Sequence, residues 1–117
     1  FLDKIITIIE IRNALNELKG KYEVVLFGSS IKDTFRPESD IDVAVLTHIK
    51  DIEKNKEIQY ALFGVASLNF DIRVFELLPI YIQISIIKDY KVIFGDPLDI
   101  SDYFYHFRKR WEDCKYR

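Results

Sequence analysis

Residues 27–45, FGSSIKDTFRPESDIDVAV, decide the fold of this chain. A Gly-Ser pair ends one apolar run at position 28, and Asp40-Ile41-Asp42 opens a second apolar run. Short apolar runs that are bounded by turn residues are typical of buried strands. The stretch therefore predicts two strands joined by a polar segment, with chemically useful side chains at both ends of that segment.

The two aspartates have the spacing of metal ligands on a strand. Residues i and i+2 of a strand project to the same face, so Asp40 and Asp42 point together while Ile41 turns to the core. Two carboxylates this close repel each other, and a divalent cation between them removes the repulsion. Oxygen ligands of this kind suit Mg²⁺ or Mn²⁺, whose open positions are commonly filled by substrate phosphates.

The Gly-Ser pair supplies features that bind anions. Gly28 lets the backbone approach a ligand closely. Ser29 and Ser30 add hydroxyl donors, and the pattern over residues 31–35 predicts a short helix whose N-terminus attracts negative charge. Together with the aspartates, these residues predict a site for a metal-bridged triphosphate.

This combination resembles the signature of the polymerase-β-type nucleotidyltransferase superfamily, and within it the minimal nucleotidyltransferases that are often paired with a HEPN-domain protein. The segment RPESDIDV, residues 36–43, is close to the form that these proteins carry, and the resemblance covers roughly residues 22–95. It implies a palm-like fold, ATP as substrate, and two Mg²⁺ ions held by Asp40, Asp42 and a third carboxylate.

Asp71 is the candidate for that third carboxylate. The segment 69–75 alternates as a strand, with Asp71 and Arg73 on one face and apolar residues on the other. By resemblance, Asp71 completes the metal site or acts as general base. Arg73 is interpreted as its ion partner.

The sequence departs from the family at two places in the phosphate turn. Many members carry Arg directly after the Gly-Ser pair and Gly near the end of the short helix, where this chain has Ser30 and Asp33. Lys32 and Arg36 are the candidates to supply the missing positive charge to the phosphates.

Composition bounds the class of protein. The chain has 117 residues, 49% of them hydrophobic, which predicts one globular domain over residues 1–117. A net charge of −2 disfavours nucleic acid as partner, and the single cysteine excludes an internal disulfide and favours a cytoplasmic location. No apolar run reaches membrane-spanning length.

The remaining pattern predicts an α/β (α+β) fold, with a small mixed sheet of about four strands and helices packed on it. Helices are predicted over 2–18, with Gly20 as stop, and over about 58–68. The alternation of isoleucines at 80–86 also fits a strand, and Pro79 favours a helix there. The expected strands are 21–27, 40–47, 69–76 and 90–94.

The last segment carries a helical aromatic stripe. Asp99, Ser101 or Asp102 is expected to cap this helix. The stripe is interpreted as core, with a partner interface as the alternative; it consists of Tyr103, Phe104, Phe107, Trp111 and Cys114. His48 and His106 have no partner at ligand spacing and are assigned no chemistry.

The resemblance implies transfer of AMP from ATP to an acceptor hydroxyl, with an antitoxin role in which a tyrosine of a HEPN toxin is AMPylated. The alternative is an inactive binding module that neutralises its partner by masking it. Transfer to RNA or to a small antibiotic is less favoured, because the chain is neither basic nor large enough for a second domain. The sequence does not determine whether the chain forms a homo-oligomer.

Overall fold

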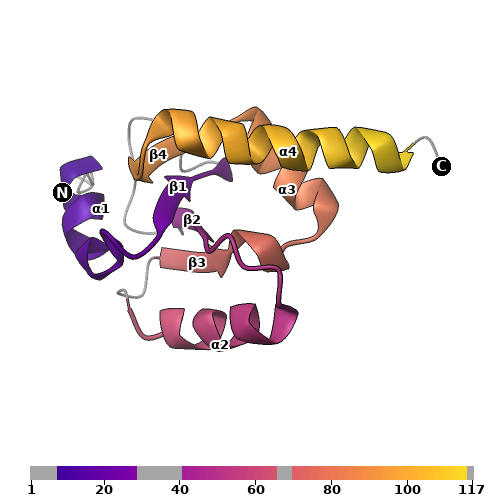
Figure 1. The fold of residues 1–117 in the computed structure, drawn as a ribbon. Coiled ribbons are helices and arrows are strands. Elements are labelled where there is room, and N and C mark those ends of the chain that lie inside the picture. Colours follow the sequence, from indigo (N-terminus) through magenta and orange to yellow (C-terminus); the bar gives the residue numbers. More distant parts are fainter. Residues whose placement is uncertain (1–7, 29–40, 66–69, 116–117) are drawn as a thin grey trace.

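Four short strands pair into one mixed sheet in the computed structural model, which describes residues 8–28, 41–65 and 70–115 (Figure 1). The strands are β1 (Glu23–Leu26), β2 (Ile41–Leu46), β3 (Phe70–Val74) and β4 (Lys91–Phe94), in the order β3-β2-β1-β4. β2 and β3 run parallel, whereas β1 is antiparallel to both β2 and β4. The expected mixed sheet of about four strands is confirmed.

Helices cover both faces of this sheet. The α-helices are α1 (Ile8–Ala14), α2 (Ile52–Leu62), α3 (Ile80–Lys88) and α4 (Pro97–Lys115), and two 3₁₀ turns are η1 (Asn16–Leu18) and η3 (Phe75–Leu77). Figure 1 shows α2 along one side of the sheet and α4 along the other. Strand residues alternate between the two faces, so each strand contributes to two separate cores.

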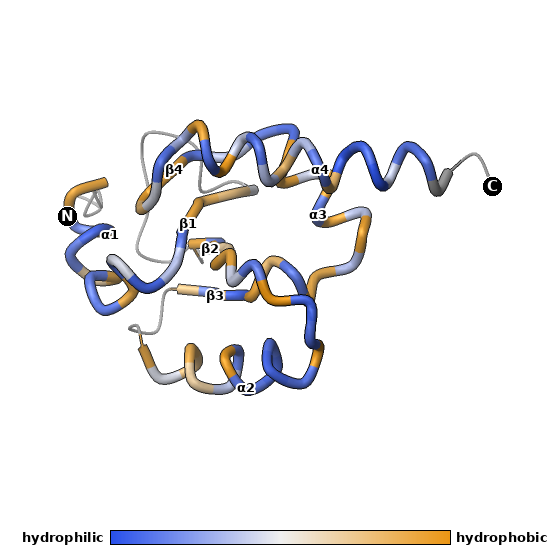
Figure 2. Tube along the Cα trace, viewed as in Figure 1, coloured by the Kyte–Doolittle hydropathy of each residue, from blue (hydrophilic) through white to orange (hydrophobic). Residues whose placement is uncertain are grey.

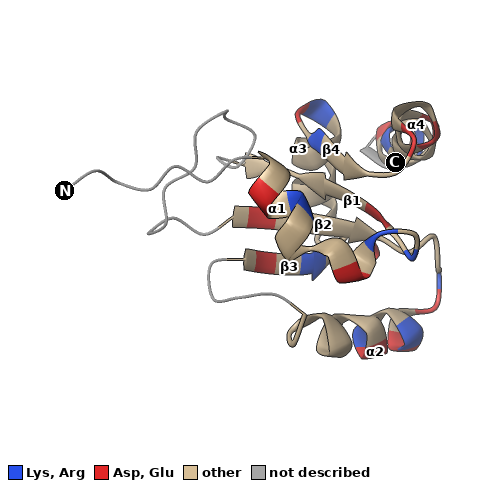
Figure 3. Cartoon of the chain, turned by 90° about the vertical axis from the view of Figure 1, so that its left-hand side faces the viewer, with Lys and Arg blue, Asp and Glu red and all other residues tan. Residues whose placement is uncertain are grey.

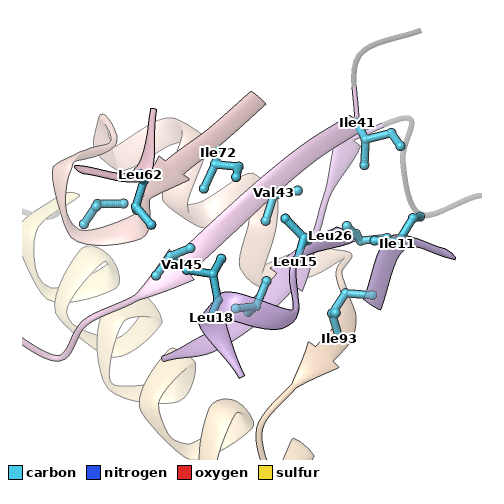
Figure 4. Close-up of a cluster of buried hydrophobic side chains, with 12 residues drawn as sticks. Ile11, Leu15, Leu18, Leu26, Ile41, Val43, Val45, Leu62, Ile72 and Ile93 are labelled. Atoms are coloured by element: carbon cyan, nitrogen blue, oxygen red, sulfur yellow. The ribbon is translucent and has the colours of Figure 1, made fainter. Parts of the chain in front are cut away.

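The first core lies under α1, η1 and α2 (Figure 4). It receives the odd-numbered residues of β2, namely Ile41, Val43 and Val45, as the alternation predicts. The second core lies under α3 and α4 and receives Ala44 and Leu46 from the opposite face of β2. Asp42 lies on this second face of β2. The next residue on the same face, Ala44, is already buried.

The N-terminal helix ends earlier than the apolar pattern predicts. Within the described residues it ends at Ala14, and a 3₁₀ turn replaces its last part. Leu15 and Leu18 still reach the core because the turn keeps them on the inner side. Gly20, with φ +82°, follows η1, so this left-handed glycine ends the 3₁₀ turn and not the α-helix as expected.

The isoleucine-rich segment is a helix, which settles the strand alternative. Pro79 immediately precedes α3, and its carbonyl accepts the first backbone bonds, from Ile82 and Gln83. The buried Gln83 donates from Nε2 to the carbonyl of Phe75 at 2.9 Å, which ties α3 to η3. A strand would have left this amide without its partner in the core.

The terminal helix is capped by a residue other than the ones expected. Asp96 accepts a hydrogen bond from the backbone N–H of Leu98 at 2.8 Å, and Pro97 takes the first helical position. The expectation of Asp99, Ser101 or Asp102 as cap was wrong because the helix begins earlier. Phe104 is buried in the second core, as the core interpretation of the stripe predicts.

The C-terminal half of α4 extends beyond the rest of the molecule (Figure 1), and Figure 2 shows it in hydrophilic colours. Arg108, Lys109 and Arg110 are exposed there. Among the helices of the described ranges, none is both long and apolar enough to cross a bilayer.

A polar cluster fastens α4 to the far ends of β2 and β3. The carboxylate of Glu76 accepts bonds from the backbone N–H groups of Thr47 and His48 at 3.1 and 2.9 Å, and from the hydroxyl of Tyr103 at 2.6 Å. The ring of Tyr103 stacks on His48 at 3.8 Å. Burial and the bond to Glu76 raise the pKa of Tyr103 far above its usual value of 10.0.

We expect Tyr103→Phe to lower the free energy of unfolding by about 1–2 kcal/mol at neutral pH, because Glu76 loses one donor while the ring remains. The raised pKa keeps Tyr103 protonated in the folded state, and this stability is lost as pH rises above the unfolded pKa of about 10. In urea unfolding, the difference in free energy of unfolding between the native chain and the variant should therefore become smaller above pH 10. Tyr105→Phe, at a tyrosine that is 58% exposed, is the control and should change little.

Candidate active site

Two carboxylates lie side by side at the end of the sheet where β2 and β3 begin. The parallel register pairs Asp42 of β2 with Asp71 of β3, and both project from the face that α3 and α4 cover further along. Figure 3 shows acidic segments at the starts of β2 and β3, side by side at the same edge. Paired strands lie about 4.8 Å apart, so the two side chains leave the backbone as direct neighbours.

The edge leaves these carboxylates in contact with water. Asp71 keeps 40% of its side chain exposed, whereas Ala44, the next β2 residue on the same face as Asp42, is fully buried. Two negative charges about 5 Å apart repel by roughly 1 kcal/mol in water and about 3 kcal/mol at an effective dielectric constant of 20. Ionised together, they therefore favour a cation between or beside them.

Gly28 lies against Asp42. A Cβ atom placed on Gly28 would come within 2.8 Å of the Asp42 carboxylate oxygen Oδ2, and Gly28 has φ +64°. The backbone N–H of Phe27 donates to the carbonyl of Asp42 at 3.1 Å, which fixes the end of β1 against the start of β2. Two separate constraints therefore require glycine at this position: the positive φ angle and the space that the Asp42 carboxylate occupies.

Arg73 is the ion partner that the sequence indicated for Asp71. Its Nε donates to Asp71 Oδ1 at 2.8 Å, and the side chains of both residues remain partly exposed. The two residues are two apart on β3 and share one face, which is the geometry expected from the alternation.

Five of the expected site residues lie outside the described residues: Asp40, Ser29, Ser30, Lys32 and Arg36. Their roles stay predictions. Within the described ranges, no group of three or more histidine, cysteine, aspartate or glutamate side chains could hold a metal ion. The described part of the site thus contains two of the three expected carboxylates.

The described residues fit a hard divalent cation. Asp42 and Asp71 offer carboxylate oxygens from adjacent strands, and oxygen ligands of this type suit Mg²⁺ or Mn²⁺. Because Gly28 has no Cβ, it leaves room for Asp42 Oδ2 beside the backbone.

Gln59 is a supporting residue that the sequence reasoning missed. From α2, its amide donates to the carbonyl of Ile72 at 2.8 Å and accepts from the N–H of Val74 at 2.7 Å. These bonds satisfy the outer edge of β3 on either side of Arg73 and hold the strand against β2. The helical stripe of α2 gave no signal for this, because a glutamine beside an apolar face is normally interpreted as solvated.

A separate groove lies at the other end of the sheet. A cavity of about 650 Å³ is lined by residues at the start of β1 and the ends of β2 and β4, among them Glu23, Leu46 and Gly95. Since Asp42 and Asp71 lie at the opposite ends of β2 and β3, this groove is separate from the carboxylate pair.

We expect Gly28→Ala to destabilise the chain by more than Gly20→Ala. Both glycines have positive φ, so each substitution costs about 1–2 kcal/mol of backbone strain. A Cβ at Gly20 meets nothing within 4 Å, whereas one at Gly28 collides with Asp42. Urea unfolding of both variants measures the difference, and equal losses would show that the contact with Asp42 has no energetic weight.

Comparison with known proteins shows the family to which the chain belongs. The sequence profile of the nucleotidyltransferase domain matches residues 8–94. A relative from Methanocaldococcus jannaschii, whose naming as a protein adenylyltransferase is provisional, is 38% identical over 96 residues, which are 82% of this chain and 74% of the relative.

Solved structures share the fold at low identity. A chain in a crystal structure of a toxin–antitoxin with AMP-PNP aligns with TM-score 0.66 and 20% identity, over 94% of this chain and 90% of that one. A chain in the complex of tri-AMPylated Shewanella oneidensis HEPN toxin with MNT antitoxin aligns with TM-score 0.61 and 19% identity, over 92% and 86%. These likenesses confirm the nucleotidyltransferase fold that the sequence resemblance implied. By its matching domain profile and its archaeal relative, the chain belongs to the nucleotidyltransferase domain family.

Proposed function

We propose that this chain transfers AMP from ATP to a hydroxyl group of a partner protein. The observation that carries the proposal is the in-register pair Asp42 and Asp71, with Gly28 against Asp42, in a chain of the nucleotidyltransferase domain family. Carboxylates at the edge of a sheet, open to water on one side, are placed to hold a metal-bound triphosphate.

Asp42 and Asp71, with Asp40, would hold two Mg²⁺ ions. When bound, these ions polarise the α-phosphate and neutralise the charge that develops on pyrophosphate. Gly28 and Ser29 bind the β- and γ-phosphates through backbone and hydroxyl donors, with Ser30, Lys32 and Arg36 as further phosphate ligands.

In the transfer step, the acceptor oxygen forms a bond to the α-phosphorus of ATP. The bond between that phosphorus and the oxygen bridging to the β-phosphate breaks, and pyrophosphate leaves with the bonding electrons. Asp71, whose side chain is 40% exposed, accepts the proton of the acceptor hydroxyl.

The acceptor that we propose is a tyrosine of a HEPN-domain toxin, with this chain as antitoxin. Two similarities support it. The 38% identical relative is provisionally named a protein adenylyltransferase, and one structure with this fold contains an AMPylated HEPN toxin beside its antitoxin. The chemistry of a phenolic hydroxyl fits a site that brings a carboxylate to the acceptor oxygen.

The test begins with calorimetric titration of ATP and Mg²⁺ into the native chain and into Asp40→Asn/Asp42→Asn. We expect metal-dependent binding that the double variant loses, because two of the carboxylates that hold the cation become neutral amides. Asp113→Asn, at an exposed aspartate on the projecting end of α4, is the control and should bind as the native chain does.

Transfer is then measured with ATP labelled at the α-phosphate and a HEPN-domain protein as acceptor. Label on a tyrosine, absent with the double variant, is the expected result. A double variant that still neutralises the toxin would instead favour the masking module, in which the carboxylates have no catalytic role.

A further inference from the structure

The hydrogen bond between Arg73 and Asp71 involves a single N–H group of the guanidinium. Arg73 donates through Nε to Asp71 Oδ1 at 2.8 Å, so its ion pair with this described residue uses one nitrogen of the guanidinium. A guanidinium carries five N–H donors and binds a carboxylate best through two of them at once. The observed contact uses the side chain of Arg73 only in part, and the residue is 51% exposed.

The backbone around Arg73 is held in place. Gln59 bonds the carbonyl of Ile72 and the N–H of Val74, the residues on either side, while the register pairs Arg73 with the small residue Ala44 on β2. The strand is therefore fixed from both edges. A change of partner at Arg73 requires rotation of an exposed side chain and no movement of β3.

We propose that Arg73 is an exchangeable counterion, which neutralises Asp71 while no cation is bound and passes to a nucleotide phosphate when a divalent cation takes Asp71. The inference rests on the proposed function, because it needs a cation at Asp42 and Asp71. It adds to that function a residue that competes with the cation and then binds the substrate.

The exchange follows from the charges of these three residues. Asp42 and Asp71 lie in register, so without a cation their mutual repulsion is relieved at Asp71 by the guanidinium 2.8 Å away. A divalent cation does this more strongly and needs the same carboxylate oxygens. The displaced guanidinium stays within one side-chain length of the site, where triphosphate oxygens are the strongest acceptors for its planar donors.

The exchange predicts effects of opposite sign for Arg73→Gln. Affinity for Mn²⁺ alone should rise about two- to fivefold, the range that corresponds to an exposed ion pair. Affinity for AMP-PNP in saturating Mn²⁺ should fall about three- to tenfold, because a charged donor to the phosphates is lost. Calorimetry gives both constants without any need for turnover.

Two further variants serve as controls. Arg73→Lys keeps the positive charge without the planar fork, and should retain nucleotide affinity to within about threefold. Lys56→Gln removes the same charge from an exposed ion pair with Glu53, on the surface of α2, and should change neither constant. Cooperative thermal unfolding of each variant establishes that it is folded.

Each outcome decides the matter. Opposite changes in the two constants support the exchange. If both affinities, for Mn²⁺ and for AMP-PNP, become weaker, Arg73 only holds Asp71 in position. If neither affinity changes, the ion pair has no role in binding. Each of these two results overturns the inference and leaves the proposed function standing. If the native chain shows no Mn²⁺ binding that Asp42→Asn abolishes, the proposed function itself is overturned, and the exchange with it.

Discussion

The parallel pairing of β2 with β3 is the constraint on which the described site depends. It sets Asp42 opposite Asp71, and a shift of one residue along either strand would turn one carboxylate into the first core. The register is specified because the apolar residues of β2 and β3 alternate with the aspartates and are buried under α1 and α2. The hydrophobic core thus fixes the position of charges that lie on the opposite face of the sheet.

Parallel strands need a crossover, and α2 provides it. The helix begins at Ile52 with Asp51 as its cap, whose Oδ1 accepts from the backbone N–H groups of Glu53 and Lys54. Its Gln59 then satisfies the outer edge of β3, which would otherwise present unpaired backbone groups to solvent or to another chain. One helix therefore both makes the parallel pairing topologically possible and stabilises the strand that carries Asp71 and Arg73.

The two ends of the sheet have different roles. At the starts of β2 and β3, the carboxylates of Asp42 and Asp71 remain partly exposed, and Asp71 forms an ion pair with Arg73. At the opposite end, the carboxylate of Glu76 is satisfied by three donors from Thr47, His48 and Tyr103, which joins α4 to the sheet. The end of the sheet under α4 is thus held by hydrogen bonds, whereas the end where chemistry is expected keeps its carboxylates partly exposed.

From the sequence alone, the alternation of Ile41, Val43 and Val45 determined which face of β2 is core, and hence the face of Asp42. The Asp71-Ile72-Arg73 alternation likewise predicted the ion pair, since period two is a local property of a strand. Local patterns did not give the bonds of Gln59, because these join α2 to the distant strand β3. The cap at Asp96 was missed because the helix begins earlier than expected. The tertiary structure alone decided that Asp42 and Asp71 are direct neighbours and that Gly28 has no room for a side chain, since strand order and register arise only when separate elements share one core.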